Sequence, residues 1–136
     1  MLPLSEVQTA LFNALVPALD PVPVVDHAGP NQVFPYVTIG ESISEETDTL
    51  TEQAVDIEMT VHVWSRQEGM KECQQLMALA KDALDRRRLP AAGFQWVTTI
   101  WIYAQTLREP DGITRHGILR FRVPTFQEQA AHKKGD

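Results

Sequence analysis

The side chains that could carry out chemistry are few and scattered along this chain of 136 residues. The four histidines are His27, His62, His116 and His132. No two of them have the short spacing of a metal-binding motif, and one cysteine, Cys73, cannot form a zinc knuckle. The chain also lacks a glycine-rich phosphate loop and the Gly-x-Ser-x-Gly elbow of hydrolases. The sequence therefore predicts no catalytic residue, no metal site and no cofactor, and the protein is not expected to be an enzyme.

Structural roles account for the two reactive side chains that stand out. Cys73 lies on the apolar stripe of a predicted helix, which favours a buried thiol over a nucleophile. His62 lies on the polar face of a predicted strand, which favours a solvated or hydrogen-bonded imidazole over a metal ligand.

The charged residues are divided unevenly along the chain. The net charge is −6, from 12 Lys and Arg against 18 Asp and Glu. Residues 1–65 contain ten acids and no base, whereas residues 66–136 contain all 12 bases and the other eight acids, so the two parts carry −10 and +4. This asymmetry predicts either pairing within one molecule or complementary surfaces on two copies. A net acidic chain is not expected to bind nucleic acid.

An acidic stretch and five arginines are the candidate contact residues. The stretch 41–48 lacks the alternating ligands and central glycine of a calcium loop, so it is either a solvated loop or an arm that meets a basic partner. Three consecutive arginines at a helix end suit the helix dipole, and no aromatic residue interleaves with them as in a nucleic-acid site. The candidate interface residues are Glu45, Glu46 and Asp48 on one side and Arg86, Arg87, Arg88, Arg120 and Arg122 on the other.

Two helices are predicted to support these residues. The first begins at Ser5, because Ser5–Gln8 has the spacing of a capping box, and it ends before Pro21. The second covers about residues 69–87, where apolar residues recur at helical spacing, and Pro90 follows its end.

Alternating apolar residues predict the strands, which cover residues 34–43, 55–64, 94–107 and 113–123, with a short edge strand at 22–25. Residues 41–53 are predicted to form a mobile hairpin arm or a loop. Neighbouring strands favour antiparallel hairpins. The predicted fold is therefore α+β, a single antiparallel sheet of about four to five strands packed by two helices on one face.

The length suits one domain, residues 1–124, and the rest, 125–136, has no periodicity and is predicted to be a flexible C-terminal tail. No apolar run approaches the roughly 20 residues that cross a bilayer, so no membrane partner is expected.

Four sequence strings resemble one family of phage proteins. They are FPYVTIGE at residues 34–41, MTVHVWSR at 59–66, ALD at 83–85 and DGITRHGILRFR at 111–122. Their order and spacing are similar to those of the tail-completion, or tail-to-head joining, proteins of long-tailed phages and prophages, a group long described as a domain of unknown function. The resemblance covers roughly residues 4–124.

The resemblance implies a structural virion component without catalytic residues. Such a tail-completion or terminator subunit is expected to form a ring, commonly of six copies, at the head-proximal end of the tail and to join tail to head. Its expected partners are itself, the tail tube protein and the head completion or connector protein, after assembly in the bacterial host cytoplasm. Gene transfer agents use similar parts. A head-completion adaptor under the portal and a small ligand-binding α+β domain remain alternatives.

Overall fold

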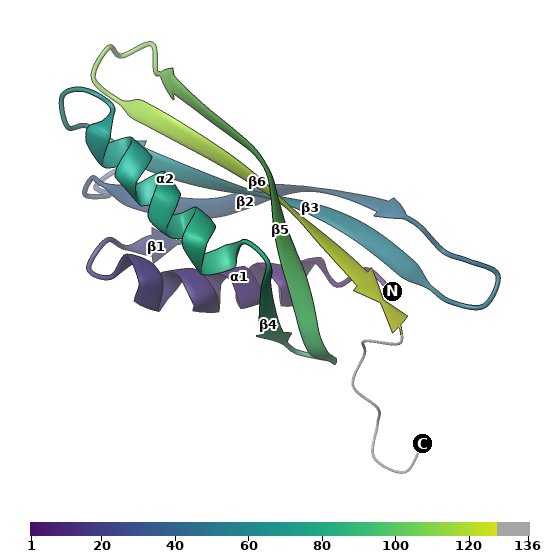
Figure 1. Ribbon diagram of the computed structural model, residues 1–136. Helices are drawn as coiled ribbons and strands as arrows, with labels where there is room; N and C mark the ends of the chain where they lie inside the picture. Colours follow the sequence, from purple (N-terminus) through teal and green to yellow (C-terminus); the bar gives the residue numbers. More distant parts are fainter. Residues whose placement is uncertain (128–136) are drawn as a thin grey trace.

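The computed structural model describes residues 1–127. Its helices and strands are, in chain order, α1 (Leu4–Leu19), β1 (Val24–Val25), β2 (Tyr36–Glu46), β3 (Ala54–Ser65), α2 (Lys71–Leu84), β4 (Arg87–Ala91), β5 (Phe94–Arg108) and β6 (Arg115–Phe126). Both helices lie on the same side of the sheet, and the β2–β3 and β5–β6 hairpins extend away from them in different directions (Figure 1).

The strands form one six-stranded sheet in the order β1-β2-β3-β6-β5-β4. Every neighbouring pair is antiparallel except β1 and β2, which are parallel. The predicted α+β class with two helices is confirmed. The sheet differs from the prediction in detail: it has six strands rather than about four to five, and the parallel pair of β1 with β2 makes it mixed rather than wholly antiparallel. The strand that was not predicted is β4, which begins at the expected last residue of the second helix.

The core lies between the helices and one face of the sheet. Successive residues of a strand point to opposite faces, so the alternation predicted for residues 55–64 places one apolar set against the helices. The buried side chains include Val55, Ile57, Met59, Val61 and Val63 of β3, Val7, Leu11 and Leu15 of α1, and Leu76, Ala80 and Leu84 of α2. The two hairpins are therefore anchored on the same core.

A glycine lets α2 pack closely on β6. A Cβ atom at Gly117 would lie 2.5 Å from Sδ of Met77 and 3.0 Å from Sγ of Cys73. Cys73 is fully buried, as its place on the apolar stripe predicted. Burial raises the pKa of its thiol to about 11, so at neutral pH the group is an unreactive thiol.

Both helices differ from the prediction at one end. The N-cap residue of α1 is Pro3, without a side-chain hydrogen bond, so the capping box at Ser5 is absent. α2 ends at Leu84, and the prediction of a helix to residue 87 is wrong. Arg86 has a φ of 58° and its N–H donates to the carbonyl oxygen of Thr99 at 2.6 Å, which turns the chain from the helix into β4.

The sheet includes the first residues of the predicted tail. Thr125 pairs with Val55 across β6 and β3, and its hydroxyl donates to the Val55 carbonyl oxygen at 2.7 Å. Residues 125 and 126 therefore belong to β6, and the predicted tail from residue 128 on lies outside the described residues. Within the described part of the chain, neither helix has the length and hydrophobicity needed to span a bilayer.

Candidate assembly interface

The acidic candidates lie on the β2–β3 hairpin. The chain does not leave the sheet at Gly40: β2 continues to Glu46, and its pairing with β3 confirms the hairpin among the two predicted alternatives. A bulge between Gly40 and Ser42, with Glu41 at a φ of 54°, interrupts the register once. Such bulges bend a strand without ending it, so the outer half of the hairpin extends past both helices (Figure 1).

Glu45, Glu46 and Asp48, which we call the acidic surface, are exposed in the outer half of this hairpin. The backbone N–H of Ala54 donates to Oδ1 of Asp48 at 2.7 Å, and this bond lowers the pKa of Asp48. A hydrogen bond with Asp48 and the charge of that residue raise the pKa of Glu46. Among the described residues, none of the three carboxylates forms a salt bridge. The N-terminal ammonium of Met1 is near enough to lower the pKa of both Glu46 and Asp48, but it forms no salt bridge with them, so the surface keeps a net negative charge.

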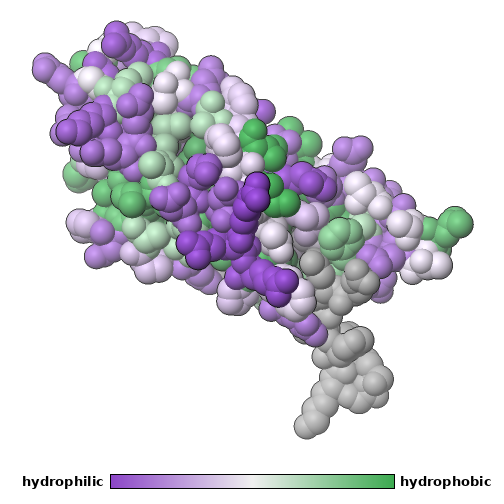
Figure 2. All heavy atoms as spheres, viewed as in Figure 1, coloured by the Kyte–Doolittle hydropathy of each residue, from purple (hydrophilic) through white to green (hydrophobic). Residues whose placement is uncertain are grey.

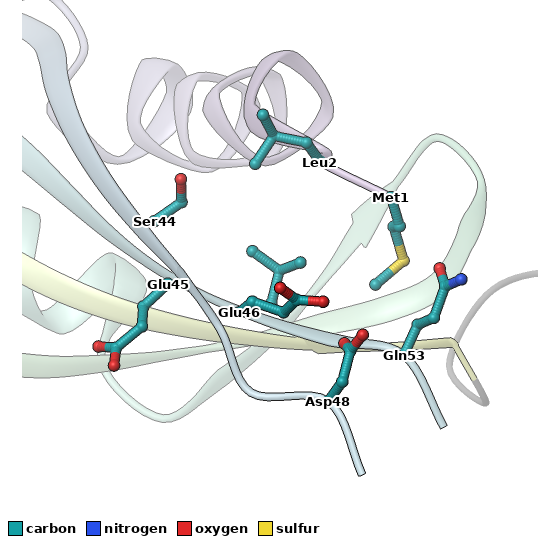
Figure 3. A pocket seen from close by; sticks show the side chains of 8 residues that line it. Met1, Leu2, Ser44, Glu45, Glu46, Asp48 and Gln53 are labelled. Carbon is teal, nitrogen blue, oxygen red and sulfur yellow. The ribbon is translucent and has the colours of Figure 1, made fainter. Parts of the chain in front are cut away.

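A hollow of about 360 Å³ lies beside the acidic surface (Figure 3). Met1 and Leu2 border it on one side, and the acidic surface borders it on the other. Its charged lining side chains are all acidic. A small-molecule site usually combines an apolar pocket with a few convergent polar groups of chosen chemistry. This hollow is better suited to receive a basic side chain than to enclose a ligand.

Arg86, Arg87 and Arg88, which we call the basic surface, lie at the opposite edge of the sheet, in and just before β4. All three are exposed, and within residues 1–127 none of them forms a salt bridge. Nε of Arg87 donates to the backbone oxygen of Asp82 at 3.3 Å, and the Arg88 guanidinium lies 5.0 Å from the centre of the Trp96 ring. Figure 2 shows strongly hydrophilic side chains where α2 ends and β4 begins.

Arg120 and Arg122 differ from these arginines because acids of the same chain pair with them. Nε of Arg122 donates to Oδ2 of Asp56 at 2.7 Å, and Nη1 of Arg120 lies 3.7 Å from Oε1 of Glu58. Both pairs join β3 to β6 on the face away from the helices. Part of the charge asymmetry is therefore balanced inside the molecule, although both arginine side chains remain partly exposed.

Two histidines that are distant in the sequence meet on the same face. Nδ1 of His62 lies 2.6 Å from Nε2 of His116, and Nδ1 of His116 lies 2.7 Å from Oε1 of Glu109. Because a carboxylate accepts, Nδ1 of His116 donates to Glu109, whereas the hydrogen between the two rings can be carried by either nitrogen. Burial and the neighbouring His116 lower the pKa of His62, so its imidazole is neutral at pH 7.

This pair could not be predicted from the sequence, because the register of β6 on β3 brings the two rings together. The only sequence signal was that each histidine lies in a predicted strand, and the pairing of β3 with β6 was not known. Within the described residues, no three His, Cys, Asp or Glu side chains form a group that could hold a metal ion. Both histidines are buried, and their contact links the central strands β3 and β6.

Comparison with known proteins identifies relatives of this chain. Residues 7–125 match the family model of tail completion protein gp17. The tail completion protein gp17 of Bacillus phage SPP1 is 31% identical over 99 residues, which cover 73% of this chain and 73% of that protein.

Two solved structures share the fold. A chain from the virion of a native gene transfer agent particle has a TM-score of 0.80 at 18% identity, with 91% of this chain and 97% of that chain covered. The bacteriophage SPP1 gp17 protein has a TM-score of 0.52 at 25% identity, with 96% and 94% covered. The first likeness, at its low identity, concerns the fold alone.

The family match covers nearly the whole described domain, and it confirms the resemblance inferred from four short strings. The SPP1 relative supports the same assignment over most of the chain. The chain belongs to the tail completion protein gp17 family, and it is a structural component of phage-type tails rather than an enzyme.

Proposed function

We propose that this protein is a ring subunit that caps the head-proximal end of the tail and joins it to the head. One observation carries the proposal: the acidic and basic surfaces lie on opposite edges of one sheet, and neither is neutralised by salt bridges among the described residues. The acidic surface of one copy then meets the basic surface of the next. A repeated contact between two different surfaces closes into a ring when the rotation per copy closes.

The hairpin also supplies apolar contact area for assembly. Ile43 is largely exposed, and Leu50, in the loop at the end of the hairpin, is fully exposed. Figure 2 shows hydrophobic atoms at this far end of the molecule. Burial of such side chains against another protein would stabilise an assembly, because it removes apolar area from water. In the proposed ring, which by resemblance to the family holds six copies, this arm reaches the adjacent copy or the tail tube protein.

Charge reversal tests the proposal. The variant Glu45→Lys, Glu46→Lys reverses the acidic surface but keeps Asp48, which fixes the turn. The variant Arg87→Glu, Arg88→Glu reverses the basic surface. Each is mixed with tail tubes of the same particle, and capped tube ends are counted by electron microscopy. We expect each reversal to abolish capping and head joining, and one chain carrying all four substitutions to recover both.

The control reverses two exposed acids away from both surfaces, Asp20→Lys and Glu68→Lys, and should cap normally. Normal capping by the acidic-surface variant would show that this surface is not the contact. Rings found under the portal of empty heads, and absent from tubes, would favour the head-completion adaptor instead.

A further inference from the structure

Each edge of the sheet is covered over only part of its length. β1 pairs with residues 37–38 of β2, and β4 pairs with β5 no further than Thr99. Among the described residues, no strand pairs with the outer side of residues 40–46 of β2 or residues 102–108 of β5. We call these the free segments. The unpaired N–H and C=O groups of such a segment are a template for another strand.

Both free segments begin at a bulge. In β2 the register shifts between Gly40 and Ser42, and in β5 it shifts between Trp101 and Tyr103. Just before the second bulge, the N–H of Trp101 donates to Oδ1 of Asp85 at 2.9 Å, so the side chain of Asp85 occupies the edge where β4 has ended. Pairing with another strand is therefore possible only beyond this point.

The free segment of β5 lacks the features that protect natural edges. Edge strands of soluble proteins usually carry charges or proline that prevent pairing with other chains. Residues 102–107 contain neither, the one charge of the segment is Arg108 at its end, and Ile102 and Tyr103 are 45% and 41% exposed. In contrast, the free segment of β2 carries Glu41, Glu45 and Glu46. An uncharged edge on one side and an acidic edge on the other are not interchangeable.

We infer that the free segment of β5 in one copy pairs antiparallel with the free segment of β2 in the next copy, so that the sheets join around the ring. This inference rests on the proposed function, because it needs copies to assemble. Three antiparallel steps separate β2 from β5 in the sheet, so the two strands run in opposite directions. A neighbour in the same orientation therefore presents β5 antiparallel to β2.

The charges beside the two segments are complementary. Nζ of Lys81 lies 4.9 Å from the centre of the Trp101 ring, and the Arg120 guanidinium lies 5.4 Å from the centre of the Tyr103 ring. Each cation also pairs with an acid of its own chain, Lys81 with Asp85 at 3.3 Å and Arg120 with Glu58 at 3.7 Å, so glutamates on an added β2 strand would share them. Pairing of two β5 segments would instead place these cations near each other and leave the β2 acids unmatched.

The two free segments lie at opposite ends of the sheet as well as at opposite edges. Each is the C-terminal part of its strand, and the two strands run in opposite directions. A neighbour must therefore be shifted along the strand direction before the segments overlap. In a closed ring such a shift tilts the strands relative to the axis, as in a sheared barrel.

Cysteine cross-linking tests the inference. Full antiparallel overlap of residues 40–46 with 102–108 places position 44 opposite position 104, at a Cα separation of roughly 4.5–5.5 Å, which a disulfide can bridge. Ser44→Cys and Ala104→Cys replace small exposed residues, and the buried Cys73 does not compete. The two single variants are mixed with tail tubes, oxidised mildly and analysed by gel, while the same sample is imaged for capped ends.

We expect a cross-linked dimer from the mixture, a ladder from the chain carrying both cysteines, and monomer from either single variant or from the control Leu79→Cys on the exposed face of α2. Capped ends without a cross-link would overturn the strand pairing and leave the ring intact. Dimer from Ala104→Cys alone would mean that like edges meet, which also overturns it. Absence of capped ends with the unmodified protein would overturn the proposed function, and the strand pairing with it.

A lysine on the free edge provides a second test. Ala104→Lys should fold normally, because residue 104 is exposed, but should prevent capping by placing a charge on the paired edge. The matched control, Gln95→Lys, changes an exposed residue of the same strand in the part that β4 covers, and it should cap tubes normally. Normal capping by Ala104→Lys, with circular dichroism unchanged, would contradict the inference.

Discussion

The outer halves of the β2–β3 and β5–β6 hairpins have the same construction but carry different side chains. In each, one strand shifts register at a bulge, and beyond it the outer side of that strand has no partner strand among the described residues. The β2 side carries glutamates, whereas the β5 side carries an uncharged run with exposed Ile102 and Tyr103. Two equal edges would allow two-fold dimers, but two different edges make association directional. In the proposed ring, this difference between the hairpins would set the direction in which one copy follows the next.

The largest expected effect on stability comes from Gly117, where α2 packs on β6. Gly117→Val places methyl groups where Met77 and Cys73 pack, and overpacking of this kind costs about 1–3 kcal/mol of unfolding free energy. Urea denaturation measures the loss. Gly29→Val is the matched control, since nothing lies within 4 Å of a Cβ atom there. If both variants unfolded at the same urea concentration, the close approach of α2 to β6 would not be required.

A salt series should separate the electrostatic contribution to capping from the contribution of apolar burial. Raising the ionic strength from about 0.1 M to 1 M shortens the Debye length from roughly 10 Å to 3 Å, so contacts of the acidic surface should weaken. We expect capping by the unmodified protein to decrease with salt but not disappear, because strand pairing and apolar burial are not screened. Counts of capped tubes across a salt series measure this. A salt-independent count would exclude the acidic surface as a contributor.

A smaller effect should appear with pH at the histidine pair. The groups that face His62 are His116, Glu41 and Arg120. Because the folded protein lowers the pKa of His62 below the ordinary 6.5, the unfolded chain binds its proton first as the pH falls. Stability is therefore fully present above about pH 6.5 and decreases as the pH falls below it. Unfolding free energies at pH 7.5 and 5.5 should differ more for the unmodified protein than for His62→Gln. If the unfolding free energy changed by the same amount between the two pH values in both proteins, the lowered pKa of His62 would be contradicted.

The smallest expected effect concerns the pair of Arg122 with Asp56, in the outer half of the β2–β3 hairpin. Cross-strand ion pairs that are partly exposed contribute roughly 0.2–1 kcal/mol. A double-mutant cycle with Arg122→Gln and Asp56→Asn should give a coupling energy in that range. Assembly of the double variant should remain normal, since these charges are already balanced inside the molecule. Loss of capping by this double variant would indicate that Arg122 takes part in the contact between copies.

Local patterns predicted the elements that alternate cleanly, and they failed where long-range contacts decide. The period-two run of β3 and the helical stripe around Cys73 each reflect one buried face, which a sequence displays directly. β4 was missed because three arginines and Pro90 obscure a strand whose existence depends on pairing with β5. Edge strands tolerate proline, since one of their sides needs no donor.

The candidate interface residues were likewise predicted well where a local pattern was enough and poorly where long-range contacts decide. Charge counting located the acidic stretch correctly on an exposed hairpin, but it could not distinguish paired from unpaired arginines. That distinction comes from register, which sets Arg120 and Arg122 within reach of acids on β3 and leaves the basic surface without them. The free segments also could not be predicted from the sequence, because an unpaired edge depends on the strand order of the whole sheet.

Mixing the two charge-reversed variants is the most direct test of head-to-tail assembly. The chain with Glu45→Lys and Glu46→Lys has two basic surfaces, and the chain with Arg87→Glu and Arg88→Glu has two acidic ones. Neither should assemble alone, but an equal mixture should form rings in which the two chains alternate, which an even number of copies permits. Electron microscopy of tubes with the mixture should therefore show capped ends. Uncapped ends with the mixture, under conditions where the unmodified protein caps, would contradict the contact between acidic and basic surfaces.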